Sequence, residues 1–290
     1  MSEDVALSRD ERRLHLHEGP IDLIIEAWGE AKEVAAALAQ AIAAFDGLLA
    51  ELAAELPLLR QPIVDVPPAL NGNVARRMAA ACWPHRAAFI TPMAAVAGAV
   101  ADHVLAAMCR DRFLSKAYVN DGGDIAFHLG SGEQLTCGMV ADLRAASIAG
   151  RIKLSAAMPV RGIATSGAPT KGSGGRSFSL GIADAVTVLA ESAAAADAAA
   201  TIIANAVDLP DHPGIRRVPA WSLDPDSDLR DRLVTVEVPK LDASAIDRAL
   251  RAGWEVADAL RARGHIYGAV LALQGRFAIS TANERRLLAA

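Results

Sequence analysis

The stretch that decides the fold is Arg161–Ala206, which reads RGIATSGAPTKGSGGRSFSLGIADAVTVLAESAAAADAAATIIANA. An apolar strand leads into a glycine-rich loop, a second apolar strand follows at Ala185–Ala190, and an alanine-rich helix closes the stretch. Glycine adopts positive φ without strain and lets the backbone approach a ligand closely. The loop is therefore open to two interpretations, a ligand-binding loop or a flexible connection.

Two polar residues stand in the alanine-rich helix, Asp197 and Thr201. Residues four apart on a helix lie on one face, so these two side chains are neighbours. A carboxylate and a hydroxyl both offer oxygen, the ligand atom that hard cations such as Mg2+ prefer. We therefore predict that Asp197 and Thr201 are metal ligands and catalytic residues.

The composition is that of a globular protein with a core of small aliphatic side chains. Hydrophobic residues make up 52% and charged residues 22% of the 290 positions, which excludes a disordered chain. Aromatic residues are 4% and the net charge is -5. These values argue against nucleic acid or an anionic membrane as the main partner. The apolar composition is compatible with a homodimer.

The three cysteines, Cys82, Cys109 and Cys137, are scattered, and no two of them have CxxC spacing. We expect reduced thiols in a cytoplasmic protein. The first residues are charged and lack the apolar core of a signal peptide. The longest apolar run, around Met93–Met108, is interrupted by an aspartate and a histidine. We expect it to be too short and too polar to span a bilayer.

The N-terminal third predicts a hairpin followed by helices. Alternating apolar residues around a Gly-Pro turn indicate a β-hairpin over residues 13–28. An apolar stripe predicts one long helix over residues 30–55 that ends at Pro57. A threonine cap followed by proline opens another helix, over residues 93–109. A buried Asp102 in that helix would need a partner.

The middle of the chain predicts strands that meet at a glycine turn. Residues 116–120 and 125–129 are apolar strands joined at Asp121-Gly122-Gly123-Asp124. Such a turn is either an ordinary polar hairpin or a close backbone approach to a ligand. Further strands are predicted over residues 134–139, 147–154 and 160–164.

The C-terminal third predicts an irregular excursion over residues 208–228, which are rich in proline and aspartate. A strand, an amphipathic helix and a closing hairpin follow within residues 233–280. The whole pattern predicts an α+β fold of mostly antiparallel sheets with packed helices, in a single domain over residues 1–290.

Three blocks, in this order, resemble motifs of the ApbE-like family of FAD:protein FMN transferases. Gly98–Asp102 is similar to K-G-[YFI]-A-x-D, Tyr118–Ile125 to V-N-x-G-G-D-[IV], and Ile163–Gly167 to A-[TV]-S-G. Ala185–Ala190 and Ala196–Thr201 follow at the family's distance and are similar to S-V-T-V-x-A and A-D-A-x-A-T. The resemblance covers roughly residues 93–207. It implies an ApbE-like fold.

The resemblance also implies a chemistry. Members of that family bind FAD, use Mg2+, and move FMN onto a threonine or serine of a target protein. On the matching positions, Asp197 and Thr201 would be the cation ligands. Contacts to the flavin nucleotide would come from the glycine turn and from the A-[TV]-S-G segment, that is from Asn120, Gly122, Gly123, Asp124, Thr165, Ser166 and Gly167.

Two departures from the motifs mark a divergent branch. Ala97 stands where the family has lysine, and Ser177–Asp184 stands where it has an H-x-I-x-D-P-x-T-G-x-P block. Three hypotheses follow. The protein is a Mg2+-dependent flavin nucleotide transferase or FAD-hydrolysing enzyme; it is a non-catalytic relative that binds a nucleotide or another small molecule; or it is a structural or interaction protein in which Asp102 and Asp197 are satisfied core carboxylates.

Overall fold

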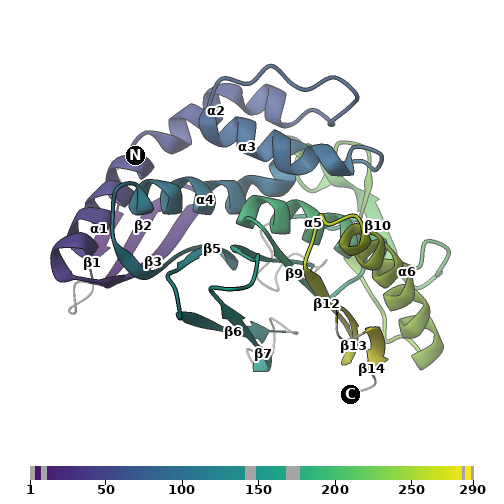
Figure 1. Ribbon diagram of the computed structural model, residues 1–290. Helices are drawn as coiled ribbons and strands as arrows, with labels where there is room; N and C mark the ends of the chain where they lie inside the picture. Colours follow the sequence, from purple (N-terminus) through teal and green to yellow (C-terminus); the bar gives the residue numbers. More distant parts are fainter. Residues whose placement is uncertain (1–3, 8–11, 141–147, 168–176, 283–284, 289–290) are drawn as a thin grey trace. The chain divides into compact units, whose positions relative to one another are not determined.

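The chain folds into helices and antiparallel strands, which confirms the α+β expectation (Figure 1). The computed structural model describes residues 4–7, 12–140, 148–167, 177–282 and 285–288. Residue contacts divide the chain into two compact units. The first holds Met1–Thr136, Lys153–Ala164 and Ala190–Asp197, and the second holds Cys137–Ile152, Thr165–Leu189 and Ala198–Ala290. The single domain over residues 1–290 stays a prediction.

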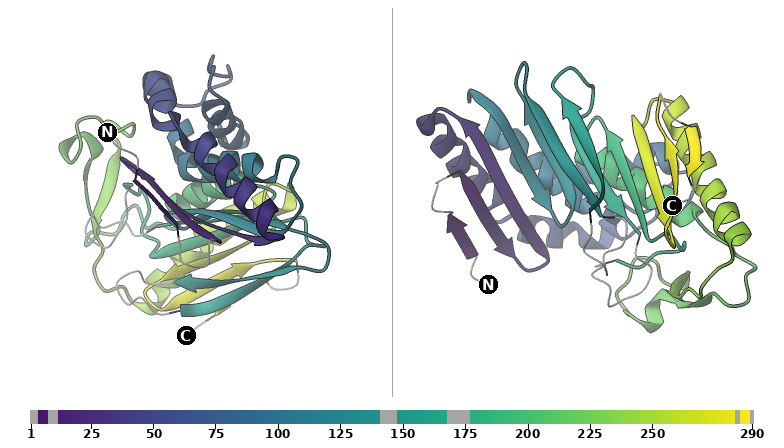
Figure 2. Two further views of the ribbon diagram at one scale, coloured as in Figure 1. Left: turned by 90° about the vertical axis from the view of Figure 1, so that its left-hand side faces the viewer. Right: turned by 90° about the horizontal axis from the view of Figure 1, so that it is seen from below.

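The first unit is built on antiparallel strands that lie side by side (Figure 2). Their order is β1 (Asp4–Leu7), β2 (Arg13–Glu18), β3 (Ile21–Gly29), β4 (Leu114–Asp121), β5 (Asp124–Leu129) and β8 (Gly162–Ser166). Alternate residues of β3 are buried, because successive side chains of a strand point to opposite faces. The hairpin predicted over residues 13–28 is confirmed as β2 and β3.

Helices cover one face of this sheet in two layers (Figure 1). The inner helices, α1 (Ala31–Phe45) and α4 (Val96–Cys109), contact the strands. In the outer layer, α3 (Asn73–Cys82) packs on α4, and α2 (Leu48–Leu59) packs on α3. Short 3-10 turns at Trp83–His85 and Pro92–Ala95 connect α3 to α4. The apolar sides of these helices and strands form one hydrophobic core.

The single long helix predicted over residues 30–55 is wrong. The structure has two helices there, because Gly47 between them adopts a φ of 73° that a continuous right-handed helix does not allow. Pro57 does not end the second helix, which continues to Leu59. The helix predicted over residues 93–109 is present as α4, preceded by the 3-10 turn that Pro92 opens.

The segment Pro92–Cys109 bears on the membrane prediction. By length and composition it could cross a bilayer, contrary to the expectation that it is too short and too polar. Half of it is buried, and the core helix of a soluble protein passes the same test. Its residues Ala99, Val100 and Val104 are fully buried in the core of the first unit.

The second unit contains antiparallel strands in the order β9 (Ala185–Ala190), β12 (Gly268–Leu273), β13 (Arg276–Ser280) and β14 (Arg285–Leu288). Helix α6 (Ala243–Ala262) packs on β12 and β13. Helix α5 (Ala193–Ala206) begins in the first unit and ends in the second. A two-stranded sheet, β6 (Gln134–Val140) and β7 (Ile148–Ser155), crosses the division between the units. Apart from β14, which the sequence did not predict, these elements agree with the predicted strands and helices to within a few residues.

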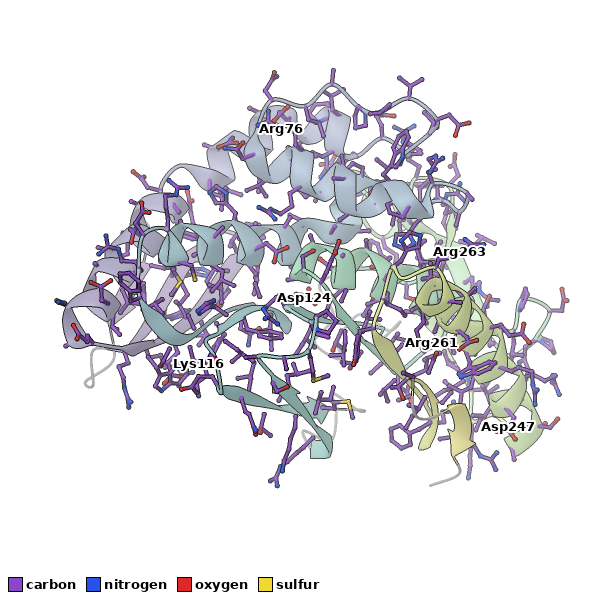
Figure 3. The ribbon with its side chains drawn as sticks, viewed as in Figure 1. Arg76, Lys116, Asp124, Asp247, Arg261 and Arg263 are labelled. Carbon is purple, nitrogen blue, oxygen red and sulfur yellow. The ribbon has the colours of Figure 1, made fainter. Side chains whose placement is uncertain are left out.

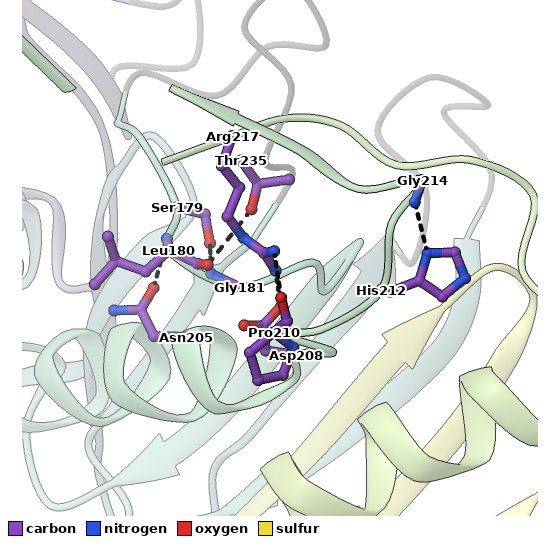
Figure 4. Close-up of polar contacts among 10 residues, drawn as sticks. All are labelled: Ser179, Leu180, Gly181, Asn205, Asp208, Pro210, His212, Gly214, Arg217 and Thr235. Carbon is purple, nitrogen blue, oxygen red and sulfur yellow. Dashed lines mark hydrogen bonds and ion pairs between the residues drawn. The ribbon is translucent and has the colours of Figure 1, made fainter. Parts of the chain in front are cut away.

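The excursion predicted as irregular contains regular structure. Strand β10 (Arg216–Pro219) pairs with β11 (Leu233–Glu237), and a 3-10 turn follows at Ala220–Ser222. Polar contacts hold this region (Figure 4). Arg217 forms an ion pair with Asp208, and the Thr235 N–H donates to the Ser179 carbonyl at 2.9 Å. The pairing arises between residues far apart in sequence, so composition alone did not reveal it.

Gly162 sets how closely α5 approaches β8 in the first unit. A Cβ at this position would lie 2.0 Å from the Ser192 carbonyl carbon and 2.1 Å from the Ala193 nitrogen. Both atoms belong to backbone, so a side chain could enter only if the strand or the helix moved.

We expect Gly162→Ala to lower the free energy of unfolding by about 1–3 kcal/mol or more, because it overpacks backbone against backbone. Urea denaturation followed by circular dichroism would measure the change. Gly150→Ala is the control, since its Cβ would meet the flexible end of the Met139 side chain instead. Equal losses in the two variants would contradict this account of the packing.

Candidate functional site

The N-terminus of α5 is capped by Asp102 of α4 and by Ser192, the residue directly before the helix. The first N–H groups of a helix have no partner within the helix and need one from elsewhere. Asp102 on α4 accepts the Ala193 N–H at Oδ1 and the Ala194 N–H at Oδ2, each at 3.0 Å. The Ser192 hydroxyl accepts the Ala195 N–H at 3.2 Å. The partner that Asp102 was expected to need is therefore the start of α5.

Asp197 makes the reverse contact. Its Oδ2 accepts the N–H of Gly98, in the first turn of α4, at 3.0 Å. A Cβ on Gly98 would lie 2.3 Å from the Ala193 carbonyl oxygen, so only glycine fits there. Each of the two helices thus supplies a carboxylate to the N-terminal turn of the other, where the helix dipole favours negative charge.

The glycine turn between β4 and β5 carries more carboxylates. Gly122 and Gly123 have φ values of 61° and 116°, and the flanking Asp121 and Asp124 are paired across the strands. Positive φ at both central residues is the conformation of a type I′ hairpin turn. The Asn120 side chain accepts the Gly123 N–H at 2.8 Å, which fixes the turn. Asp124 lies at the start of β5 (Figure 3).

The two glycines of this turn are uncrowded within the described part of the chain. A Cβ added to either Gly122 or Gly123 would meet no atom of the described residues within 4 Å. The two glycines therefore serve the positive φ of the turn rather than close packing. A ligand could approach the turn backbone at these two positions without displacing atoms of the described residues.

The carboxylates of the β4–β5 turn affect the pKa of Asp197. Burial raises the pKa of Asp197 well above its usual range, and the carboxylates of Asp124, Asp121 and Asp102 raise this pKa further. The hydrogen bond from Gly98 acts in the opposite direction. Carboxylates from α4, α5 and the β4–β5 turn therefore share one electrostatic environment in the first unit. Negative charge in such an environment is costly unless a proton or a positive charge offsets it.

Asp102 is more fully compensated than Asp197. Burial raises the pKa of Asp102, while its hydrogen bonds from Ala194 and Ala193 lower that pKa. Arg77 also lowers it, with Nη1 4.0 Å from Asp102 Oδ2. The carboxylate is 9% exposed. The negative charge of Asp102 is thus compensated by the first N–H groups of α5 and by Arg77.

No three or more His, Cys, Asp and Glu side chains are grouped to hold a metal ion, among the residues that the structure describes. A cation beside Asp197 would therefore need other oxygen ligands, such as hydroxyl and backbone carbonyl groups. The predicted second ligand, Thr201, is part-buried on the portion of α5 that belongs to the second unit. The metal roles of Asp197 and Thr201 stay predictions.

The predicted flavin contacts of the A-[TV]-S-G segment belong to the second unit. The Thr165 hydroxyl lies 2.9 Å from the Thr187 hydroxyl on β9. Ser166 is part-buried, and Gly167 has a φ of 130°. The glycine-rich part of the following loop, residues 168–176, lies outside the described residues. Flavin contact by Thr165, Ser166 and Gly167 stays a prediction.

Comparison with known proteins identifies the family. A family model described as AbpE bacteria matches residues 5–279, nearly the whole chain. The protein belongs to the AbpE bacteria family. The match supports the ApbE-related kinship that the three motif blocks indicated.

This AbpE bacteria protein is also similar to several archaeal UPF0280 proteins. The one from Methanospirillum hungatei JF-1 is 34% identical over 156 residues, which cover 50% of this chain and 56% of the relative. The one from Archaeoglobus fulgidus is 35% identical over 137 residues, 47% and 52% of the two chains. The one from Methanopyrus kandleri is 40% identical over 134 residues, 46% and 48%. The chain thus spans about half the length of the curated relatives it matches, in agreement with a divergent branch.

The raised pKa of Asp197 predicts how stability depends on pH when no divalent cation is present. A carboxyl whose pKa is higher in the folded than in the unfolded protein holds its proton longer in the folded state, so stability falls as pH rises from about 4 through the folded-state pKa. The amide of Asp197→Asn cannot ionise. Its stability relative to wild type should therefore increase as pH rises through that window.

Melting temperatures of wild type and Asp197→Asn, measured in chelator over a pH series, would check this. The exposed Asp211 of the second unit offers the matched control, because Asp211→Asn also replaces one carboxylate by an amide. Asp211→Asn should follow the wild-type curve. Parallel curves for wild type and Asp197→Asn would show that the Asp197 charge is not disfavoured in the folded state.

Proposed function

We propose that this protein is a Mg2+-dependent enzyme that cleaves the phosphoanhydride of FAD and transfers FMN to a hydroxyl group. The observation that carries the proposal is the environment of Asp197. It combines a carboxylate of raised pKa, two further carboxylates at a glycine turn, and glycines at that turn that no atom of the described residues crowds. Membership of an ApbE-related family supports the choice of FAD as substrate. We also propose that the fold is ApbE-like.

The reaction is a phosphoryl transfer. The oxygen of a threonine or serine side chain, or of water, attacks the phosphorus of the FMN half. The bond from that phosphorus to the bridging oxygen breaks, AMP leaves with the bridging oxygen, and the proton of the attacking hydroxyl or water passes to the AMP phosphate or to solvent. The products are FMN joined to the acceptor plus AMP, or free FMN plus AMP. Such a reaction depends on positioning and on charge neutralisation more than on covalent help from the protein.

The residues divide this work. Asp197 uses Oδ2 to accept the Gly98 N–H, so Oδ1 would face the cation, with the Thr201 hydroxyl as second ligand. A bound Mg2+ would supply charge neutralisation on the diphosphate oxygens. The backbone of the Gly122-Gly123 turn would approach the nucleotide, and Asn120 would hold the turn in shape.

A specific observation favours the alternative, a non-catalytic relative that binds a nucleotide or another small molecule. The segment Ser177–Asp184 lacks the His, Pro and Thr of the family's H-x-I-x-D-P-x-T-G-x-P block. Its one matching residue, Asp184, accepts the Gln274 N–H at 2.5 Å through its carboxylate. Asp184 thereby stabilises the β12–β13 turn, in which Gln274 has a φ of 44°.

The wider proposal keeps the remaining expectations from sequence. The protein would be cytoplasmic, with a flavin nucleotide as its small-molecule partner. It would bind neither nucleic acid nor membrane, and it would form a homodimer.

The decisive assay incubates the protein with FAD and Mg2+ and follows FMN and AMP by chromatography. We expect product with wild type. We expect a loss on the order of 100-fold or more in Asp197→Asn, because the charge that would bind the cation is removed. Thr201→Ala should lose less, and the exposed Asp211→Asn should match wild type.

Each outcome of this assay selects one hypothesis. Product that depends on Asp197 supports the transferase or hydrolase. If calorimetry detects FAD binding but no AMP forms, the non-catalytic relative is correct. Absence of both binding and product would leave the structural or interaction protein.

A further inference from the structure

We infer that Asp102 is a positioning residue for the cation site: by holding the first turn of α5 against α4, it sets where Asp197 lies. The inference rests on the proposed function, because it concerns the same site. The family resemblance assigned no role to Asp102, and the contacts of its carboxylate now suggest one. Asp102 accepts the Ala193 and Ala194 N–H groups with its two oxygens, each at 3.0 Å.

Two contacts with consecutive N–H groups restrict rotation of the helix as well as translation. A single hydrogen bond would leave α5 able to pivot, whereas a bidentate carboxylate fixes its direction. Asp197 lies four residues after Ala193 on the same helix, about one turn further. Because a helix is stiff over one turn, any displacement of Ala193 and Ala194 is passed on to Asp197.

Two glycines make the fit tight. Side chains at Gly98 and Gly162 would meet the backbone of Ala193 and Ser192 at 2.3 Å and 2.0 Å. At these two glycines the backbone at the start of α5 therefore packs directly on the backbone of α4 and β8. A helix packed this closely has few alternative positions. The hydrogen bonds of Asp102 therefore hold Asp197 in a single position.

The nearby carboxylates therefore divide into two roles. Asp102 is compensated by two N–H groups and lies beside Arg77, at 4.0 Å. Asp197 accepts the Gly98 N–H with one carboxylate oxygen, and the negative charges of Asp121 and Asp124 raise its pKa. We assign Asp102 to orientation, and Asp197 to the cation.

Titration calorimetry with Mg2+ alone tests the assignment on the full-length protein. Asp102→Asn keeps the shape of the side chain but leaves one N–H of α5 without an acceptor. We expect the dissociation constant for Mg2+ to rise about 10- to 100-fold, the range for residues that orient a metal ligand. Near-complete loss of binding is expected for Asp197→Asn.

A matched control separates positioning from general helix capping. Asp242 caps α6 in the second unit by accepting the Ala245 N–H at 2.8 Å. Asp242→Ala, which removes this acceptor, should lower the melting temperature by about 2–4 °C. Its dissociation constant for Mg2+ should stay at the wild-type value.

A milder variant keeps the test decisive should Asp102→Asn fail to fold. Ser192→Ala removes a hydroxyl that accepts the Ala195 N–H and also hydrogen-bonds the Asp102 side chain, while the Asp102 carboxylate itself is kept. It loosens the same helix start, so we expect a several-fold weaker affinity for Mg2+.

Two results would overturn the inference in different ways. If wild type binds Mg2+ and the folded Asp102 and Ser192 variants bind it equally well, Asp102 does not position the site, while the proposed function stands. If wild type binds no Mg2+, the proposed cation site itself is wrong, and the role of Asp102 falls with it.

Discussion

The first unit depends on an exchange of carboxylates between two helices. Asp102 of α4 accepts the first N–H groups of α5, and Asp197 of α5 accepts an N–H in the first turn of α4. Each contact satisfies backbone groups that the core would otherwise leave unpaired. The exchange requires the helix ends to approach closely, which Gly98 and Gly162 permit because they lack a Cβ.

This arrangement concentrates negative charge where burial makes it costly. Asp102 is offset by backbone N–H groups and by Arg77, whereas the pKa of Asp197 is raised by burial and by the acids of the β4–β5 turn. Under the proposed function, the same negative charge that costs stability would be the charge that holds the cation. The same contacts thus join the packing of the first unit to its proposed chemistry.

Much of the fold could be predicted from local patterns. Alternation of apolar residues located the β2–β3 hairpin, and the apolar run at β9 was predicted with its observed bounds. The error at Gly47 arose because the apolar stripe continues on both sides of a residue whose left-handed conformation separates α1 from α2. Strand β10 was missed because its partner β11 lies well beyond it in sequence. Of the candidate site, Asp197 and the glycine turn were predicted, but the contacts of Asp102 were not.

The sequence alone determined the α+β class, the order of most strands and helices, and the ApbE-related kinship, because apolar periodicity and short motifs are local properties. It also indicated that a buried aspartate in α4 needs a partner. The tertiary structure alone decided which partner that is: the start of α5, about 90 residues away. Hydrogen bonds between distant segments depend on how closely two backbones approach, and that distance exists only after the helices have packed against each other and against the sheet.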